Sequence, residues 1–233
     1  MIRKFFAEEA AKLREMNFTD KRQYIWEYYK LHMFFAALIL FIGGSLINVW
    51  FINPPKRDYF YIAWQGGHID ARVLENLEDR LNIIVDEEIQ GRYRATVRSY
   101  VLSGEPTFDQ ALVTRFHALI SVGAIHTTIT SYAGVEEAAV HGLLLPVDYV
   151  MAEIAALDPV MYRVISDNVL HMTFTMEDGT EVTAAIAINL RYAPLLTELG
   201  FNTDDLYIGV ITTSTNHYQT AKGLLVMFAE GSS

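Results

Sequence analysis

The sequence predicts an α/β protein: one transmembrane helix followed by an open, mainly parallel sheet with helices on both faces and an added β-hairpin. Three observations predict this fold class. Residues 33–53 form an uninterrupted apolar run. From residue 59 to residue 141, strand-like and helix-like segments alternate, an order typical of parallel strands joined by crossover helices. Later in the chain, Asp178-Gly179 separates two strand-like runs, which is a strong hairpin signal.

The apolar run, MFFAALILFIGGSLINVWFIN, has no charged residue across 21 positions. At about 1.5 Å per residue, a helix of this length spans roughly 30 Å, the thickness of the hydrocarbon core of a bilayer. Aromatic residues suited to the membrane interface flank the run or close it, namely Tyr24, Trp26, Tyr28 and Trp50. We expect a helix that starts at Asp20, is capped by Thr19 and stops before Pro54-Pro55.

Charge predicts the orientation of this span. Residues 1–32 carry seven Lys/Arg and five acids, whereas residues 55–233 carry 11 basic and 23 acidic residues, a net charge of −12. Near the span, four basic residues precede it and three (Lys56, Arg57 and Arg72) follow it. This weak positive-inside bias, with the short head and the large acidic body, favours a cytoplasmic head and an extracytoplasmic body in the cell membrane. The expected domains are a cytoplasmic head (1–30) with an amphipathic helix at Ile2–Met16, a transmembrane helix (31–53) and an extracytoplasmic α/β domain (54–233). A cleaved signal peptide is the alternative, although the head is long for its charged region.

The first half of the body alternates strands and helices. Apolar, alternating and β-branched runs predict three strands, at Tyr59–Trp64, Tyr93–Leu102 and Ile125–Thr130. Apolar residues three and four positions apart predict three helices, at Ile69–Leu81, Phe108–Ile120 and Val135–His141. This half therefore predicts the parallel part of the sheet.

The second half departs from the alternation. Helical patterns occur on both sides of Pro159, at Val147–Ala156 and Val160–Val164. Two strands, Val169–Thr175 and Val182–Asn189, flank the predicted hairpin turn at Glu177-Asp178-Gly179. The remaining elements are a helix, a strand and a last helix, at Ala193–Leu199, Leu206–Thr212 and His217–Glu230.

The composition excludes several kinds of function. The chain has no cysteine, which excludes disulfides, thiolate metal sites, a cysteine nucleophile and a lipidated cysteine. The acidic body repels phosphate and so argues against nucleic-acid binding. No P-loop, G-x-S-x-G or G-x-G-x-x-G pattern occurs, and the histidines of the body form no H-x-H or H-x-x-x-H pair. We therefore expect a protein that is not an enzyme and that uses no metal or cofactor.

Four loops at the carboxyl ends of the expected strands form the candidate binding site, because open parallel α/β sheets bind ligands there. Three of these loops are rich in hydroxyl, amide and glycine groups, which suit a small polar or zwitterionic ligand. The candidate residues are Gln65, Gly66, His68, Ser131, Tyr132, Ser214, Thr215 and Asn216. The same residue types are also ordinary in turns and helix caps.

Two stretches of the body carry a family likeness. The first runs from Phe108 through Thr130, a helix, a small-residue turn and a strand, and continues in Gly142-Leu-Leu-Leu-Pro-Val-Asp148, which is similar to a G-x-L-x-P-L-D phrase. The second runs from Tyr207 to Phe228, a strand, a small polar turn and a final helix. Both resemble the solute-binding proteins of ABC importers, and Asp20–Lys30 resembles the juxtamembrane segment of Firmicutes membrane proteins that carry such a domain. The resemblance implies a type II periplasmic-binding-like lobe with the candidate loops facing its cleft.

Two departures from that family shape the functional expectation. The body has room for about one lobe instead of two, and a helix replaces the lipidated cysteine. Since one lobe cannot close on a ligand by hinge motion, we expect an accessory or interaction subunit of a membrane complex, partnered by the bilayer and by a membrane protein that binds residues 1–53. The alternative is an anchored solute-binding or sensing module that presents a small polar ligand to an ABC importer.

Overall fold

The computed structural model describes residues 14, 16–52, 56–85, 92–175 and 179–229. The chain divides into two compact units, Met1–Pro55 and Lys56–Ser233. Most of the predicted helix at Ile2–Met16, the stop at Pro54-Pro55 and the turn residues Glu177-Asp178 lie outside the described residues.

The described part of the first unit is dominated by one long helix. Helix α2 (Phe18–Ile47) continues into a π-helical turn, η1 (Asn48–Ile52). The side chain of Asn17 accepts a hydrogen bond from the Asp20 N–H at 3.0 Å, so the predicted cap at Thr19 is wrong and the helix begins two residues earlier. Asn is at least as good an N-cap as Thr, and its position three residues before a free N–H matches the capping geometry.

Within α2 and η1, Trp26–Ile52 is the one helical stretch of the described residues that is long and apolar enough to cross a membrane. None of its most apolar stretch is buried inside the protein. The predicted interface residues Trp26, Tyr28 and Trp50 are all exposed, and the rings of Tyr24 and Tyr28 pack against each other in a tilted arrangement, with centroids 4.7 Å apart. Length and composition fit a membrane anchor, and a signal sequence near the N-terminus meets the same criteria.

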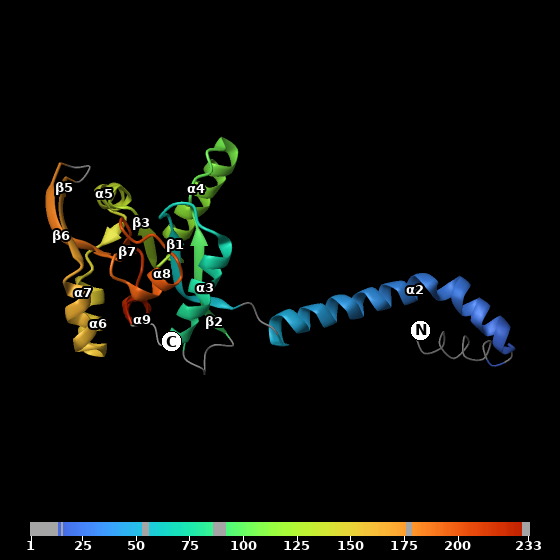
Figure 1. Ribbon diagram of the computed structural model, residues 1–233. Helices are drawn as coiled ribbons and strands as arrows, with labels where there is room; N and C mark the ends of the chain where they lie inside the picture. Colours follow the sequence, from blue (N-terminus) through green and yellow to red (C-terminus); the bar gives the residue numbers. More distant parts are fainter. Residues whose placement is uncertain (1–13, 15, 53–55, 86–91, 176–178, 230–233) are drawn as a thin grey trace. The chain divides into compact units, whose positions relative to one another are not determined.

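The second unit is built on a seven-stranded sheet of order β2-β1-β3-β7-β6-β5, with β4 paired to β7 (Figure 1). Its strands are β1 (Arg57–Trp64), β2 (Tyr93–Ser99), β3 (Thr127–Thr130), β4 (Leu144–Leu145), β5 (Val169–Thr175), β6 (Glu181–Asn189) and β7 (Tyr207–Ile211). Its helices are α3 (Ala71–Leu81), η2 (Asn82–Ile84), α4 (Pro106–Ser121), α5 (Tyr132–Val140), α6 (Asp148–Leu157), α7 (Pro159–Ser166), α8 (Pro194–Glu198) and α9 (His217–Phe228).

The sheet is mixed, so the prediction of a mainly parallel sheet is wrong for its second half. Strand β1 pairs in parallel with β2 and β3. Strand β7 is antiparallel to β3, β4 and β6, and β5 is antiparallel to β6. Strands β5 and β6 are antiparallel because they form a hairpin. The last strand, β7, lies between β3 and β6 and runs in the opposite direction to β3. Periodicity locates a strand, but it carries no information about the direction of its partner.

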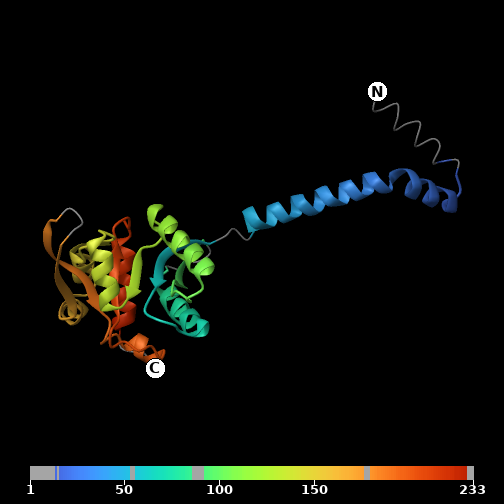
Figure 2. The ribbon, with the colours of Figure 1, turned by 90° about the horizontal axis from the view of Figure 1, so that it is seen from above.

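Alternating side chains along β1 divide the core into two layers. Phe60, Ile62 and Trp64 join the cluster that includes buried residues of α3, α6 and α9, while Tyr61 and Ala63 join the cluster that includes buried residues of α4 and α5. The predicted helices on both faces are therefore confirmed. Figure 2 shows α3 and α4 on opposite sides of β1.

Neighbouring strands β1 and β3 send the chain to opposite faces of the sheet. Strand β1 is followed by α3, which packs in one layer, and β3 is followed by α5, which packs in the other. Such a reversal is a topological switch point, where open α/β sheets leave a crevice beside the carboxyl ends of the strands. At this point the N–H of Gln65 donates to the carbonyl of Ile129 at 2.7 Å.

Candidate ligand-binding cleft

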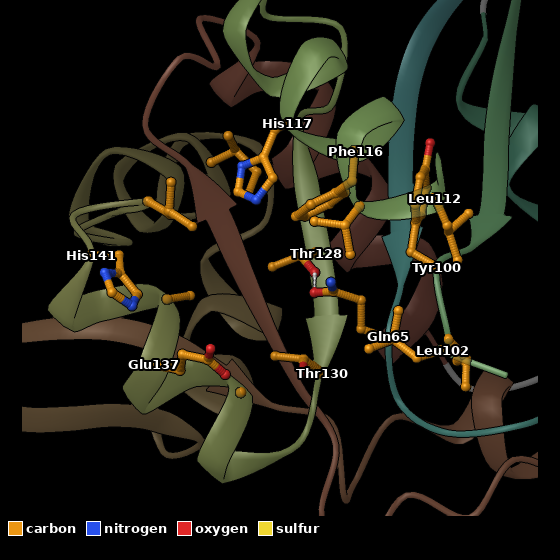
Figure 3. Close-up of a pocket in the computed structure, with 16 residues that line it drawn as sticks. Gln65, Tyr100, Leu102, Leu112, Phe116, His117, Thr128, Thr130, Glu137 and His141 are labelled. Atoms are coloured by element: carbon orange, nitrogen blue, oxygen red, sulfur yellow. Dashed lines mark hydrogen bonds between the residues drawn. The ribbon is translucent and has the colours of Figure 1, made fainter. Parts of the chain in front are cut away.

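A cleft of about 610 Å³ lies between α4 and α5, on one face of the sheet, and reaches the switch point at Gln65 (Figure 3). Its floor comes from the end of β1, from β3 and from β7, one wall from α4 with the residues that follow β2, and the other wall from α5. The lining residues that the figure labels are Gln65, Tyr100, Leu102, Leu112, Phe116, His117, Thr128, Thr130, Glu137 and His141. The volume is within the range of about 300–1,000 Å³ that is usual for small-molecule sites.

The polar floor follows from the alternation of a short buried strand. All four residues of β3 are buried, and Ile129 packs in the layer that includes α9. Because side chains alternate along a strand, Thr128 and Thr130 face the other layer, where both line the cleft. Two hydroxyl groups therefore stand in one row beneath a largely apolar space.

Gln65 and Thr128 form the centre of this floor. The Thr128 hydroxyl lies 2.9 Å from Oε1 of Gln65 and 3.3 Å from the carbonyl oxygen of Ala63. A hydroxyl has one hydrogen to donate, so it serves these two acceptors alternately, and the side-chain amide of Gln65 is held against the strand at the cleft. The floor thus offers an amide and hydroxyls, which can both donate and accept.

A tyrosine pair supports the wall beside α4. The hydroxyls of Tyr61 and Tyr100 are 2.8 Å apart in the core, and the Tyr100 ring packs on Phe116 with centroids 5.1 Å apart. Burial is the main cause that raises the pKa of Tyr61, and the hydrogen bond to Tyr100 adds to it. Tyr61 stays protonated, so this wall carries an uncharged aromatic network.

Close packing on β3 positions the wall formed by α5. Ser131 caps the helix by accepting a hydrogen bond from the Gly134 N–H at 3.3 Å. A Cβ on Gly134 would collide with the Thr130 side chain, so glycine lets the first turn of α5 rest on the floor. Glu137 and His141 follow on the same helix or at its end, and both are exposed at the rim of the cleft.

Of the predicted site residues, Gln65 is the one that lines the cleft. Gly66 packs into the opposite layer, where an added Cβ would lie 3.0 Å from the Trp64 ring. His68 is exposed in the same loop. Ser131 serves as the cap of α5, and the ring of Tyr132 packs edge-on against that of Tyr207.

The other predicted residues, Ser214, Thr215 and Asn216, lie at the opposite edge of the sheet from Gln65. Strand β7 is antiparallel to β3, with Thr127 opposite Val210 and Thr130 opposite Tyr207. The carboxyl end of β7 therefore meets the amino end of β3. Ser214 is buried there and Thr215 is exposed, so the predicted loops do not converge on one site.

At that opposite edge, His126 takes a structural place. Its Nδ1 accepts a hydrogen bond from the Tyr61 N–H at 2.9 Å, and its ring is stacked on Phe60 at 6.5 Å between centroids. Burial lowers the pKa of His126 to about 4, against a smaller opposing effect of Asp58. The imidazole is neutral at physiological pH and joins β1 to the start of β3.

Several residues that line the cleft were not predicted from the sequence, among them Tyr100, Phe116, Thr128, Glu137 and His141. Phe116 lies in the predicted helix Phe108–Ile120, whose apolar spacing is that of ordinary core packing, and Glu137 lies in the predicted helix Val135–His141, outside any metal-ligand or catalytic motif. The one available signal was the strand TTIT, because three hydroxyl residues in a buried strand are unusual unless they serve a polar contact.

Among the residues that the structure describes, no group of three or more His, Asp or Glu side chains is placed to hold a metal ion. The cleft is bordered by three such residues, His117 on α4 and Glu137 and His141 on α5 or at its end. They lie at the rim of the cleft and are not grouped as metal ligands. The arrangement suits binding of an organic molecule between an apolar wall and a polar floor.

Comparison of the chain with protein-family models, with curated proteins and with solved structures finds no match. The functional inference therefore rests on the fold and on the residues of the cleft.

Proposed function

We propose that this protein is a membrane-anchored, non-catalytic binding or sensing module whose Lys56–Ser233 unit holds a small molecule in the α4–α5 cleft. The observation that carries the proposal is a cleft over the α4–α5 face of the sheet that reaches the carboxyl ends of β1, β2 and β3 at Gln65, Tyr100 and Thr130, beside the switch point where α/β sheets bind ligands. Its apolar walls and its few polar groups on one floor are the usual make-up of such a site.

The anchor and the location belong to the same proposal. Trp26–Ile52 would cross the cell membrane once, with the head in the cytoplasm and the acidic domain outside. Four basic residues lie within 20 positions before the span and three within 20 positions after it, a small positive-inside bias that supports this orientation.

The resemblance to solute-binding proteins supports a role beside an ABC importer. A parallel β2-β1-β3 arrangement with helices on both faces and a cleft that reaches its carboxyl edge is what one lobe of such a protein would need. In this proposal the single lobe captures a ligand without closing over it and presents the ligand to a transporter that the span holds nearby.

A second candidate function is that of an accessory subunit whose domain contacts another protein. Apolar side chains stand exposed on α4 and in the segments that flank it: Leu102 is 58% exposed, Phe108 55% and Val122 77%. Exposed apolar groups that gather on one element are typical of contact surfaces. A stoichiometric membrane partner that copurifies with the full chain and is lost on deletion of residues 1–30 would favour this function.

A fragment screen tests the binding function. The full chain in nanodiscs would be screened by ligand-observed NMR against amino acids, sugars, peptides and small amphipathic compounds. Ala138→Phe should fill the cleft, because Ala138 lines the α5 wall, and should abolish the saturation-transfer signal of true ligands. Val160→Phe is the matched control, since Val160 is 73% exposed on α7 and does not line the cleft. If every signal persists in Ala138→Phe, or if no compound binds, the proposed function is wrong.

A further inference from the structure

The cleft that the proposed function uses has an unequal distribution of charge. Among the described residues that line it, Glu137 is the one acidic side chain, and no Lys or Arg is present. His117 and His141 stand on opposite walls. The basic residue of α4, Arg115, does not line the cleft. The surrounding body has a net charge of −12, which adds a field of the same sign as Glu137.

This distribution opposes an anionic ligand. A carboxylate or phosphate that leaves water for a largely apolar cleft needs a cation or several donors to replace its hydration. The floor offers no charged donor: the Thr128 hydroxyl donates to Oε1 of Gln65 or to the carbonyl of Ala63, which leaves the Gln65 amide N–H groups and the Thr130 hydroxyl as uncharged donors. A negative ligand would also meet Glu137 at the rim, whereas an ammonium group could pair with it.

The apolar wall indicates the body of the ligand. Leu112, Val113 and Phe116 from α4 stand over the floor together with Leu102, and Tyr100 and Phe116 form one tilted aromatic surface. Aromatic rings pack well on such surfaces in tilted or offset arrangements. A planar or branched apolar group therefore fits this side, while its polar group reaches the row of Gln65, Thr128 and Thr130.

We propose that the cleft selects a neutral or cationic amphipathic molecule, with an aromatic or branched apolar body and one polar group that exchanges hydrogen bonds with the floor. The proposal rests on the binding function given above and names its ligand class. It replaces the small zwitterionic ligand that the loop residues suggested, because a zwitterion would bring a carboxylate into a cleft whose described lining has an acidic side chain and no Lys or Arg.

Three probes of nearly equal size test the ligand class: tryptamine is cationic, indole-3-acetamide is neutral and indole-3-acetate is anionic. Their dissociation constants would be measured by ligand-observed NMR on the full chain in nanodiscs, with empty nanodiscs and Ala138→Phe as the background for lipid partition. We expect tryptamine and indole-3-acetamide to bind, and we expect the dissociation constant of indole-3-acetate to be at least about tenfold higher.

Two neighbouring acids on α5 provide a matched pair of variants. Glu137→Gln should weaken tryptamine about two- to fivefold, as for a pair at an exposed rim, and should leave the amide unchanged. Glu136→Gln removes an exposed charge from the same helix outside the cleft, and it should change neither probe. Val113→Arg, at a wall position that is 40% exposed, should shift the preference toward indole-3-acetate.

The outcomes separate the ligand class from the binding function. If indole-3-acetate binds as tightly as the other two and Ala138→Phe removes that binding, the ligand class is wrong and the binding function stands. If none of the probes binds above background, the ligand class is also wrong. The binding function is then wrong as well only if the wider fragment screen finds no ligand. Equal effects of Glu137→Gln and Glu136→Gln would likewise contradict the role of Glu137. Circular dichroism and melting temperature of each variant would show that it is folded.

Discussion

Asn216 and His126 meet where α9 begins and β3 is about to start, with Nδ2 of Asn216 2.7 Å from Nε2 of the imidazole. Nδ1 of His126 is already the acceptor for the Tyr61 N–H, so the neutral ring carries its hydrogen on Nε2. The amide of Asn216 can turn about its terminal torsion and present its oxygen to that hydrogen. A neutral histidine thereby links three segments that are far apart in the chain.

Stability should depend on pH through His126. Its pKa is about 4 in the folded protein and about 6.5 in an unfolded chain. Between these values the unfolded state binds more protons, so this contribution is present above pH 6.5 and is lost as the pH falls toward 4. Between pH 7 and pH 4, the free energy of unfolding in urea should fall in both the wild-type protein and His126→Gln. We expect the fall in the wild-type protein to be larger by about 3 kcal/mol. His141→Gln, which changes an exposed histidine, should keep the wild-type pH dependence; equal slopes for all three proteins would contradict the prediction.

The edge strand β2 should depend on Glu78 of α3. Its Oε2 accepts hydrogen bonds from the Val97 N–H at 2.9 Å and from Arg98 at 2.8 Å, and 17% of its side chain is exposed. Glu78→Ala leaves a backbone donor of an edge strand without this acceptor and should cost about 1–2 kcal/mol of unfolding free energy. Glu198→Ala breaks the Arg80–Glu198 pair, in which both side chains are 45% exposed, and should cost less than about 0.5 kcal/mol. Urea unfolding measures both, and similar costs would show that Glu78 acts only as a surface charge.

Gly134 and Thr130 should be energetically coupled. An added Cβ at Gly134 collides with the Thr130 side chain, so Gly134→Ala should push α5 off the floor of the cleft and cost about 1–3 kcal/mol. In the double variant with Thr130→Ala the collision is absent, and the combined cost should be smaller than the sum of the two single costs. A double-mutant cycle of unfolding free energies tests this, and additive costs would mean that the helix accommodates the methyl group elsewhere.

The absence of cysteine makes the proposed orientation directly testable. A single cysteine at Val160, which is 73% exposed, should react with a membrane-impermeant maleimide on intact cells if the domain lies outside. A single cysteine at Thr19, exposed at the start of α2, should react only after the cells are permeabilised. The reverse labelling pattern would place the domain in the cytoplasm, and loss of the Thr19 label with the head would indicate a cleaved signal.

The order of elements was accessible from the sequence because it depends on local properties. The apolar segment ending near Phe51, the helix with apolar residues at Leu74, Leu77 and Leu81, and the strand Tyr59–Trp64 all appear where the patterns place them. Strand β4, Leu144–Leu145, was missed because two residues are too few to show a period. The cap of α2 was misplaced by two residues because Asn17 and Thr19 can both cap a helix and lie close together in the sequence.

The candidate site was only partly accessible, because it depends on which strands become neighbours. The rule that ligands bind at the carboxyl ends of parallel strands selected Gln65, and Gln65 lines the cleft beside β1 and β3, which run parallel. It placed Asn216 wrongly beside Gln65, since β7 runs against β3 and carries its carboxyl end to the other edge.

The sequence by itself determined the apolar segment, the order of helices and strands and the charge of the domain, since each is a property of composition or of short-range periodicity. Only the tertiary structure decided the direction of β7, the row of Thr128 and Thr130 beneath α4, and the meeting of His126 with Asn216. The physical reason is that pairing of distant segments is selected by the packing of whole faces, and no local pattern encodes that choice.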